Sequence, residues 1–404
     1  MKVISGGVTA ATGFTAGGVH CGIRKSRAKR DLGLIYSDVP AQAAAVYTTN
    51  LVKGAPLLVT KRHLADGVAQ ACIINSGNAN TCNANGEEIA EKTASLLASA
   101  LGIKAEDVVV ASTGVIGQPM TIEPFERGIP ALIKDLSTDG SARAAEAIMT
   151  TDTVKKEIAI SFEIGGKTVK MGGIAKGSGM IHPNMATMLV FLTTDCAITA
   201  EMLQKALSTD VESTFNMVSV DGDTSTNDMV TILANGMAGN PVISKEGEDF
   251  ATFMQALNSV TVALCKALAA DGEGATKFLE CTVTGAKTLA DAKKAAKAVI
   301  CSSLVKAAMF GSDANWGRVL CAIGYSGADV DVTKVDVSFM SSKGSISVCE
   351  KGASVDFSEE IAKEILSEKE ITIAVTLHDG DASSVAWGSD LTYDYVRING
   401  DYRT

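Results

Sequence analysis

The stretch Lys176-Gly-Ser-Gly-Met-Ile-His-Pro-Asn-Met-Ala-Thr-Met-Leu189 joins a glycine-rich loop to an apolar run, Met188-Leu-Val-Phe-Leu192, that is typical of a buried strand. A threonine hydroxyl is a poor nucleophile until a base removes its proton, and the α-amine of an N-terminal threonine can be that base. A free α-amine has a pKa of about 7.7–8.0, so part of it is unprotonated near neutral pH. Thr187 is internal, so it would first have to become a chain end.

Cleavage of the Ala186–Thr187 bond by the Thr187 hydroxyl would create that end. The hydroxyl attacks the Ala186 carbonyl, the acyl group shifts from nitrogen to oxygen, and water releases a new N-terminus. Gly177 and Gly179 permit the backbone angles that strain such a bond, and the methyl group of Ala186 leaves its carbonyl open to attack. Taken alone, however, a glycine-rich loop before a buried strand is a common arrangement, and His182 beside a proline is more often structural than catalytic.

Composition excludes several other functions. The chain has 404 residues, 46% of them hydrophobic, which suffices for a large core and more than one domain. Its net charge of −10 and its pI near 5.1 argue against nucleic acid or an anionic membrane as a partner. One basic cluster, residues 24–30, runs against this charge, and we interpret it as a solvated loop before a strand.

Cysteine and histidine usage predicts a cytoplasmic protein without a metal site. The nine cysteines are odd in number, scattered and never spaced as CxxC, which is typical of reduced thiols. The four histidines lie far apart, at positions 20, 63, 182 and 378, so they do not predict a metal centre. The N-terminus lacks the apolar core of a signal peptide, and no run of about 18 apolar residues predicts a membrane span.

Hydrophobic periodicity predicts alternating strands and helices. Strands are expected at 32–36, 45–49, 70–74, 107–111, 188–192, 279–284, 335–339, 345–349 and 371–377. Helices are expected at 87–101, 200–207 with Thr199 as the N-cap, 250–268, 290–308 and 359–366. Turns are expected at 75–80 and 112–114. The order in the last third predicts a compact α/β subdomain that begins near residue 282, and the polar tail is expected to return to the body of the protein.

The opening stretch resembles the self-cleavage signature of the ornithine acetyltransferase family, the glutamate N-acetyltransferases of arginine biosynthesis. Further segments resemble motifs of the same family, in family order, over essentially the full chain. They are GGVTA (6–10), SDVPA (37–41), TTN (48–50), NSGNAN (75–80), STGVIG (112–117), MTTDT (149–153), VDGDTSTND (220–228), DGEGATK (271–277), GSDANWGR (311–318) and INGDYRT (398–404).

This resemblance implies a fold and a division of the chain. The fold would be α/β, with a layered α-β-β-α core that carries an autocatalytically released N-terminal threonine nucleophile and with a smaller C-terminal α/β subdomain. Residues 1–186 would form the alpha chain, 187–281 the start of the beta chain, 282–392 the subdomain and 393–404 a tail that returns to the active site. The two chains would stay together, as a heterotetramer of two alpha and two beta chains.

The resemblance also implies residue roles. Thr187 would be the nucleophile both in cleavage and in turnover, in which it takes the acetyl group from N-acetylornithine and passes it to glutamate. Thr113 and Gly114 would form the oxyanion hole. Without the resemblance, these two residues would be interpreted as an ordinary turn after a strand. Substrate contacts would come from Thr150, Lys176, Thr187, Glu273, Asn399 and Thr404. Thr151 is an alternative to Thr150, and Lys155 departs from the family, which often has proline there.

Two other readings stay open. An autoprocessed amidase or aminopeptidase would use the same nucleophile but pass the acyl group to water, and a non-catalytic binding protein would keep the fold without turnover. Within the family, some members also accept acetyl-CoA as a co-substrate, and no residue of this sequence decides that point. No cofactor is implied.

Overall fold

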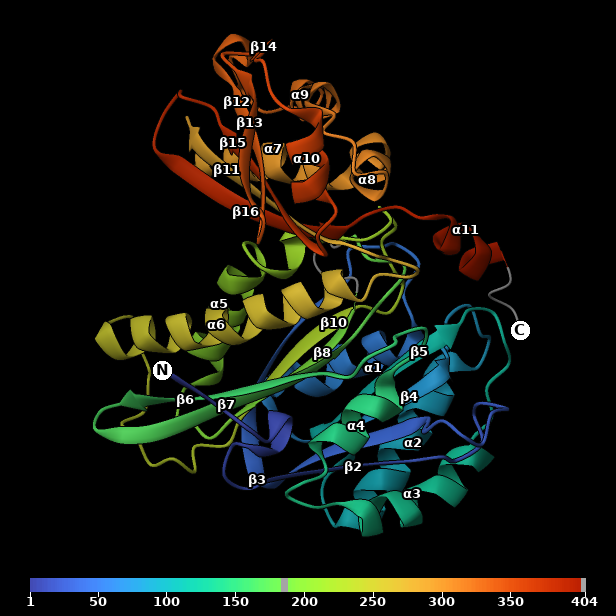
Figure 1. The fold of residues 1–404 in the computed structure, drawn as a ribbon. Coiled ribbons are helices and arrows are strands. Elements are labelled where there is room, and N and C mark those ends of the chain that lie inside the picture. Colours follow the sequence, from blue (N-terminus) through green and yellow to red (C-terminus); the bar gives the residue numbers. More distant parts are fainter. Residues whose placement is uncertain (183–187, 401–404) are drawn as a thin grey trace. The chain divides into compact units, whose positions relative to one another are not determined.

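The protein folds into two compact units. The computed structural model describes residues 1–182 and 188–400 (Figure 1). The first unit comprises Met1–Gly177, Pro183–Phe215 and Thr224–Leu264, and the second comprises Ser178–His182, Asn216–Asp223 and Cys265–Thr404. Helix α6 (Glu248–Ala270) begins in the first unit and ends in the second.

A nine-stranded mixed sheet forms the centre of the first unit. Its strand order is β1-β6-β7-β8-β10-β3-β4-β5, with β2 also paired to β3. The pairs β4–β5 and β8–β10 run parallel, whereas the other neighbouring strands run antiparallel. The strands are β1 (Lys2–Ile4), β2 (Phe14–Val19), β3 (Leu32–Tyr47), β4 (Val68–Asn78), β5 (Val108–Val115), β6 (Lys156–Ile164), β7 (Lys167–Lys176), β8 (Leu189–Thr194) and β10 (Met229–Ala234).

Helices bury both faces of this sheet. On β4, Cys72 and Ile74 belong to one apolar cluster, which includes residues of α4, whereas Ala71 and Ile73 belong to another, which includes residues of α2 and α3. Burial on both faces explains why such strands read as continuous apolar runs rather than as alternating ones. The helices of this unit are α1 (Ala55–His63), α2 (Gly86–Leu101), α3 (Glu123–Asp135), α4 (Ser141–Ile148) and α5 (Ala200–Val211).

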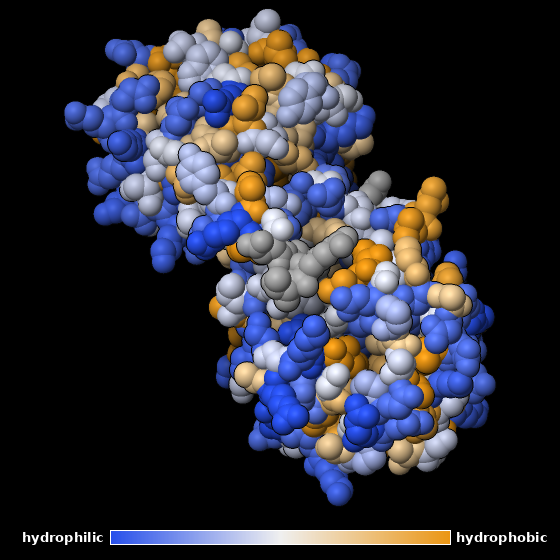
Figure 2. Space-filling model, turned by 90° about the vertical axis from the view of Figure 1, so that its right-hand side faces the viewer, coloured by the Kyte–Doolittle hydropathy of each residue, from blue (hydrophilic) through white to orange (hydrophobic). Residues whose placement is uncertain are grey.

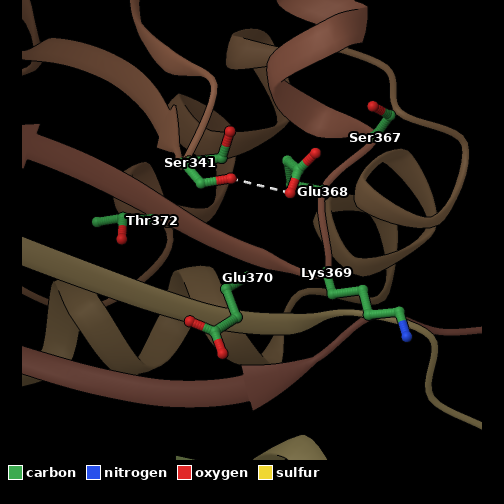
Figure 3. A pocket seen from close by; sticks show the side chains of 7 residues that line it. Ser341, Ser367, Glu368, Lys369, Glu370 and Thr372 are labelled. Atoms are coloured by element: carbon green, nitrogen blue, oxygen red, sulfur yellow. Dashed lines mark hydrogen bonds between the residues drawn. The ribbon is translucent and has the colours of Figure 1, made fainter.

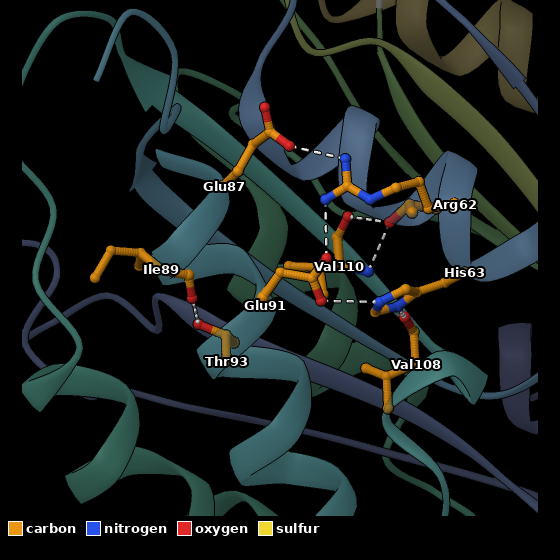
Figure 4. Close-up of polar contacts among 9 residues, drawn as sticks. Arg62, His63, Glu87, Ile89, Glu91, Thr93, Val108 and Val110 are labelled. Carbon is orange, nitrogen blue, oxygen red and sulfur yellow. Dashed lines mark hydrogen bonds and ion pairs between the residues drawn. The ribbon is translucent and has the colours of Figure 1, made fainter. Parts of the chain in front are cut away.

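Polar contacts from α1 and α2 hold β5 in place (Figure 4). The Thr60 hydroxyl donates to the Val110 carbonyl at 2.8 Å and accepts from the Val110 N–H at 2.9 Å. The buried His63 ring lies with Nδ1 2.8 Å from the Val108 carbonyl oxygen and Nε2 3.1 Å from a carboxylate oxygen of Glu91. These side chains therefore fix the strand that carries Thr113 and Gly114 near its C-terminal end.

A seven-stranded sheet forms the second unit, with the order β14-β13-β12-β15-β11-β16-β9. Its strands are β9 (Val218–Ser219), β11 (Phe278–Ala286), β12 (Asp336–Ser341), β13 (Gly344–Glu350), β14 (Ala353–Ser354), β15 (Glu370–Thr376) and β16 (Ala382–Ser389). Its helices, besides the end of α6, are α7 (Leu289–Cys301), α8 (Ser303–Phe310), α9 (Trp316–Gly324), α10 (Glu359–Leu366) and α11 (Tyr393–Gly400). Short 3-10 helices complete the chain at Gly7–Thr9, Leu64–Asp66, Ala105–Asp107, Phe215–Met217 and Val332–Lys334.

The predicted fold class is confirmed: the protein is α/β, with a layered core and a smaller α/β part towards the C-terminus. The predicted N-cap of α5 is also confirmed, because the Thr199 side chain accepts the N–H of Met202 at 3.3 Å. The single helix predicted over 290–308 is wrong. Ser302 adopts an extended conformation (ψ 111°) after α7, and its side chain caps α8.

Several strands differ from the prediction in extent or existence. The two strands predicted at 32–36 and 45–49 are wrong, because they form one continuous strand, β3. Strand β5 runs on to Val115, so residues 112–114 are not the predicted turn, and β4 likewise runs on to Asn78 through most of the turn predicted at 75–80. Strand β16 was not predicted at all. Its sequence, ASSVAWGS, lacks an apolar run, and its place is set by pairing with β11 and β9.

Within the described residues, α6 is the one helix with the length and apolar composition of a membrane span. Half of its most apolar window is buried inside the structure, and Phe253, Leu257 and Leu264 are at most 1% exposed. This burial is typical of a core helix. The face drawn in Figure 2 is mostly hydrophilic, with its apolar side chains in small groups.

Candidate active site

Lys176 and Thr113 meet at the end of the sheet of the first unit. Lys176 is the last residue of β7 and is only 8% exposed, and its Nζ donates to the Thr113 Oγ1 at 3.3 Å. In this hydrogen bond the Thr113 oxygen is the acceptor, so its hydroxyl hydrogen can be donated to another group. The structure thus brings together two of the predicted site residues, which lie 63 positions apart in the sequence.

Gly114 lies where two strand backbones come close together. It is in register with Gly77 of β4, and both have positive φ, +131° and +114° respectively. A Cβ at Gly114 would lie 2.3 Å from the carbonyl carbon of Gly77, so no side chain fits there. The requirement for glycine at this position is therefore steric, and it explains the Thr-Gly pair of the motif.

Asp152 organises the backbone around Lys176. Its carboxylate accepts the Lys156 ammonium and the Gly177 N–H, each at 2.7 Å, and the N–H of Thr150 at 2.9 Å. Burial alone would raise the pKa of Asp152, but the charges of Lys176 and Lys156 and these hydrogen bonds outweigh it, and the pKa falls to about 2. The structure thereby ties Thr150, a predicted substrate contact, to the residue that follows Lys176.

Asp228 is a second buried acid in this region, with the opposite behaviour. It is 2% exposed, and among the described residues no group hydrogen-bonds its Oδ2. Burial raises the pKa of Asp228 well above its ordinary value, although the nearby charge of Lys176 lowers it in part. Asp228 directly precedes Met229, whose N–H donates to the Met188 carbonyl at 2.9 Å.

Asn227 holds the loop before β10 against the ends of β4 and β5. Its side-chain amide donates to the carbonyls of Ala79 at 2.6 Å and Ser112 at 2.9 Å, and its side-chain oxygen accepts the Thr81 hydroxyl at 2.6 Å. Sequence reasoning assigned no role to Asp152, Asn227 or Asp228. The sequence does contain a sign that these three residues belong to the site, because all three lie within the family motifs at 149–153 and 220–228.

In the second unit, Glu273 and Asn399 are in direct contact. The side-chain amide of Asn399, on α11, donates to Glu273 Oε2 at 2.7 Å. The Glu273 N–H donates to the Ser178 carbonyl at 2.9 Å, and a Cβ at Gly179 would lie 2.3 Å from the Glu273 carboxylate. Both predicted contacts thus lie beside the loop that follows Lys176 in the sequence, and the absence of a side chain at Gly179 leaves room for the Glu273 carboxylate.

The same loop is held by Asp221. Its carboxylate accepts the backbone N–H groups of Met180 at 2.6 Å and Ile181 at 2.9 Å, and the Tyr395 hydroxyl donates to it at 3.3 Å. The neighbouring His182 has Nδ1 3.1 Å from the Ser219 hydroxyl oxygen. Burial, and then the charge of Lys297, lower the pKa of His182 to about 4, so the ring is neutral at physiological pH.

Three predicted site residues, Ala186, Thr187 and Thr404, lie outside the described residues. In the sequence, Thr187 stands two positions before Leu189, which pairs with Lys176 across β7 and β8. Among residues 1–182 and 188–400, no group of three or more His, Cys, Asp or Glu side chains is arranged to hold a metal ion.

A separate pocket in the second unit, of about 630 Å³, contains none of the predicted site residues (Figure 3). Its walls are polar, and the Ser342 hydroxyl donates to a carboxylate oxygen of Glu368 at 2.9 Å. The lining residues are Ser341, Ser342, Ser367, Glu368, Lys369, Glu370 and Thr372.

Comparison with known proteins extends the resemblance seen in the motifs. The sequence model of the ArgJ family matches residues 15–404. The chain is 53% identical over 406 residues to the arginine biosynthesis bifunctional protein ArgJ of Symbiobacterium thermophilum, with 100% of both chains covered. It is 50% identical over 405 residues to the protein of the same name from Caldanaerobacter subterraneus subsp. tengcongensis, again with 100% of both chains covered.

A solved structure agrees with the fold. The crystal structure of the arginine biosynthesis bifunctional protein ArgJ from Bacillus halodurans is 47% identical to this chain and aligns with a TM-score of 0.51. The alignment covers 53% of this chain and 99% of that one.

Proposed function

The chain belongs to the ArgJ family, and from this premise we propose that it transfers an acetyl group from N-acetylornithine to glutamate in arginine biosynthesis. The observation that carries the proposal is the contact of Lys176 with Thr113 beside Gly114, at residues for which the family resemblance predicts substrate binding and an oxyanion hole. It would be a glutamate N-acetyltransferase acting in the cytoplasm.

In this proposal the enzyme first prepares its own nucleophile. The Thr187 hydroxyl attacks the Ala186 carbonyl, the peptide bond becomes an ester, and water hydrolyses the ester. The products are an alpha chain that ends in the Ala186 carboxylate and a beta chain that begins with Thr187. Its α-amine then serves as the base that takes the hydroxyl proton during turnover.

Turnover would proceed in two acyl transfers. The Thr187 hydroxyl attacks the acetyl carbonyl of N-acetylornithine, and ornithine leaves with the proton that the hydroxyl lost. The amine of glutamate then attacks the acetyl ester, which forms N-acetylglutamate and restores the hydroxyl. Each step passes through a tetrahedral oxyanion, which we assign to the Thr113 hydroxyl and the Gly114 N–H. The removal of one such donor typically costs about 2.7–4 kcal/mol of transition-state stabilisation.

Charge complementarity supports the remaining assignments. Both substrates carry a carboxylate, and ornithine carries a cationic side chain, so a pocket for them needs a cation, an anion and neutral donors. We assign these roles to Lys176, to Glu273, and to the polar groups of Thr150, Asn399 and Thr404. The cleaved chains would assemble as a heterotetramer of two alpha and two beta chains. Acetyl-CoA would be an alternative acetyl donor, and no cofactor is required.

A denaturing mass spectrum of the purified protein tests the first step. We expect two chains, 1–186 and 187–404, and a single intact chain for Thr187→Ala. Thr187→Ser should retain part of the cleavage and part of the turnover. Thr138→Ala, which changes an exposed threonine far from the motif in sequence, is the matched control and should be cleaved like the parent. An intact parental chain with full activity would refute the proposed nucleophile.

An assay with N-acetylornithine separates this function from the hydrolytic alternative. With glutamate present we expect N-acetylglutamate and ornithine in equal amounts, and without glutamate we expect the reaction to stop after one turnover. Steady release of acetate without glutamate would instead identify an amidase. A cleaved protein that forms neither product would identify a binding protein.

A further inference from the structure

The stretch Ser178–His182 directly precedes, in the sequence, the segment that contains the proposed cleavage bond. It belongs to the second unit. Backbone hydrogen bonds within that unit hold it near both ends, because the Ser178 carbonyl accepts the Glu273 N–H at 2.9 Å and the Ile181 carbonyl accepts the Val220 N–H at 2.7 Å. The second unit therefore fixes the backbone that leads into the cleavage segment.

Met180, in the middle of this stretch, has a left-handed backbone conformation, with φ +55°. Residues with a side chain rarely adopt such an angle, because the Cβ then comes too close to a neighbouring carbonyl oxygen. Burial of the side chain does not explain the conformation, since Met180 is 42% exposed. A strained backbone of this kind persists only where the surrounding structure holds it.

The Asp221 carboxylate supplies that restraint. One of its oxygens accepts the Met180 N–H at 2.6 Å, and the other accepts the Ile181 N–H at 2.9 Å. Successive backbone N–H groups converge on one anion in this way when a residue between them is left-handed. Hydrogen bonds to a charged acceptor are also stronger than those between neutral groups. Asp221 therefore stabilises the strained conformation of Met180 itself.

Helix α11 holds the same carboxylate from another part of the chain. The Tyr395 hydroxyl donates to Asp221 at 3.3 Å, across 174 positions of sequence. Burial, and then the charge of Asp221, raise the pKa of Tyr395, so its hydroxyl keeps the proton that it donates. The helix is fixed in turn by Gly274, whose carbonyl accepts the Thr392 hydroxyl at 2.7 Å. A Cβ at Gly274 would lie 2.7 Å from the Tyr395 nitrogen, so α11 packs directly on this glycine.

We propose that Asp221 is a positioning residue for cleavage of the Ala186–Thr187 bond, and that Tyr395 makes this cleavage depend on the docking of α11. The inference rests on the proposed function, since it concerns the step that creates the threonine nucleophile. Attack by a hydroxyl needs a close and aligned approach, and a displacement of about 1 Å can slow such a reaction ~10²-fold. Loss of the restraint at Met180 would release the backbone just before the reacting residues.

The position of α11 in the sequence gives this dependence a consequence. The helix lies far beyond the cleavage bond, so the contacts of Asp221 are complete only when the second unit has folded around both segments. A chain in which α11 has not docked would keep Thr187 internal and therefore without its α-amine. Cleavage would thus follow folding of the second unit rather than precede it.

Timed cell-free synthesis of the full chain tests the proposal. Samples are denatured at intervals, and the intact chain and its two products are quantified by mass spectrometry. Asp221→Asn should slow cleavage at least tenfold, because an amide cannot accept hydrogen bonds at both of its terminal atoms. Tyr395→Phe, which removes only a hydroxyl, should slow cleavage about threefold. Tyr393→Phe removes the hydroxyl of an exposed tyrosine on the same helix and should be cleaved like the parent.

A second substitution separates positioning from a general loss of stability. Glycine adopts the left-handed conformation without strain, so Met180→Gly added to Asp221→Asn should raise the cleavage rate at least threefold over Asp221→Asn alone. A merely structural role of Asp221 would give no such gain. Circular dichroism of each variant in the Thr187→Ala background measures the folded fraction. If Asp221→Asn does not fold, the comparison of Tyr395→Phe with Tyr393→Phe decides.

Equal cleavage rates in the parent and a folded Asp221→Asn would overturn the proposal, as would equal rates in Tyr395→Phe and Tyr393→Phe. No gain from Met180→Gly would also overturn it. A parent chain that is never cleaved, or a Thr187→Ala chain that is cleaved, would instead refute the proposed function.

Discussion

Replacement of Asp152 by asparagine should destabilise the first unit and disturb the backbone on either side of Lys176. The carboxylate is buried and accepts Lys156 Nζ and the Gly177 N–H, each at 2.7 Å. The side chain of Lys156 is itself 0% exposed, so Asp152→Asn leaves a buried ammonium without its counter-charge.

The size of the effect follows from the pKa of Asp152, which is about 2 against an ordinary value of 3.8. That gap, at ~1.36 kcal/mol per pKa unit, amounts to roughly 2–3 kcal/mol of stability. Removal of one partner from a buried ion pair typically costs about 3–5 kcal/mol. We therefore expect Asp152→Asn to lower the free energy of unfolding by about 3 kcal/mol at pH 7.

The measurement is urea unfolding followed by far-UV circular dichroism. It should be made in the Thr187→Ala background, in which the proposed cleavage cannot occur. The folded pKa of Asp152 is depressed, so its contribution is present in full above pH 3.8 and is lost as the pH falls through about 2. The difference between parent and variant should shrink in that window.

Asp139→Asn is the matched control, because Asp139 is an exposed aspartate with a lowered pKa, caused first by a hydrogen bond from Ser137 and then by the charge of Arg143. It should leave the unfolding midpoint unchanged, because exposed ion pairs contribute little. The double variant with Lys156→Met should recover much of the lost stability, since it removes the uncompensated charge. A loss below about 1 kcal/mol for Asp152→Asn, or no recovery in the double variant, would refute the reasoning.

Three further outcomes are expected. Thr113→Val should lower kcat about 10²–10³-fold with N-acetylornithine and glutamate, because it removes one oxyanion donor, and an unchanged kcat would exclude that role. Gly114→Ala should yield little folded protein, since its Cβ would lie 2.3 Å from a backbone carbon, and a normal yield of soluble, folded variant would contradict this. Burial lowers the pKa of Lys306 from 10.5 to about 8. The free energy of unfolding of the parent, measured relative to that of Lys306→Met, should therefore rise between pH 8 and pH 10.5. If the difference between the two free energies does not change with pH, the reasoning about the buried Lys306 charge is wrong.

Local sequence determined the elements whose signals lie within the elements themselves. Thr199 caps α5 because its hydroxyl reaches an N–H three residues away, and apolar runs such as 188–192 are strands because both sheet faces are buried. The same local reasoning failed at Ser302, where an alanine-rich run continues but the backbone breaks, and at β16, where pairing with neighbours outweighs a weak local pattern.

The candidate site divides in the same way. The sequence by itself determined the family, through motifs along the whole chain. These motifs also predicted which residues belong to the site: Thr113, Gly114, Lys176, Glu273 and Asn399. Only the tertiary structure decided that Lys176 donates to Thr113, that Asn399 contacts Glu273, and that Asp221 joins Met180 to Tyr395. Strand register and burial act between residues distant in sequence. They also lower the pKa of Asp152 and raise the pKa of Asp228.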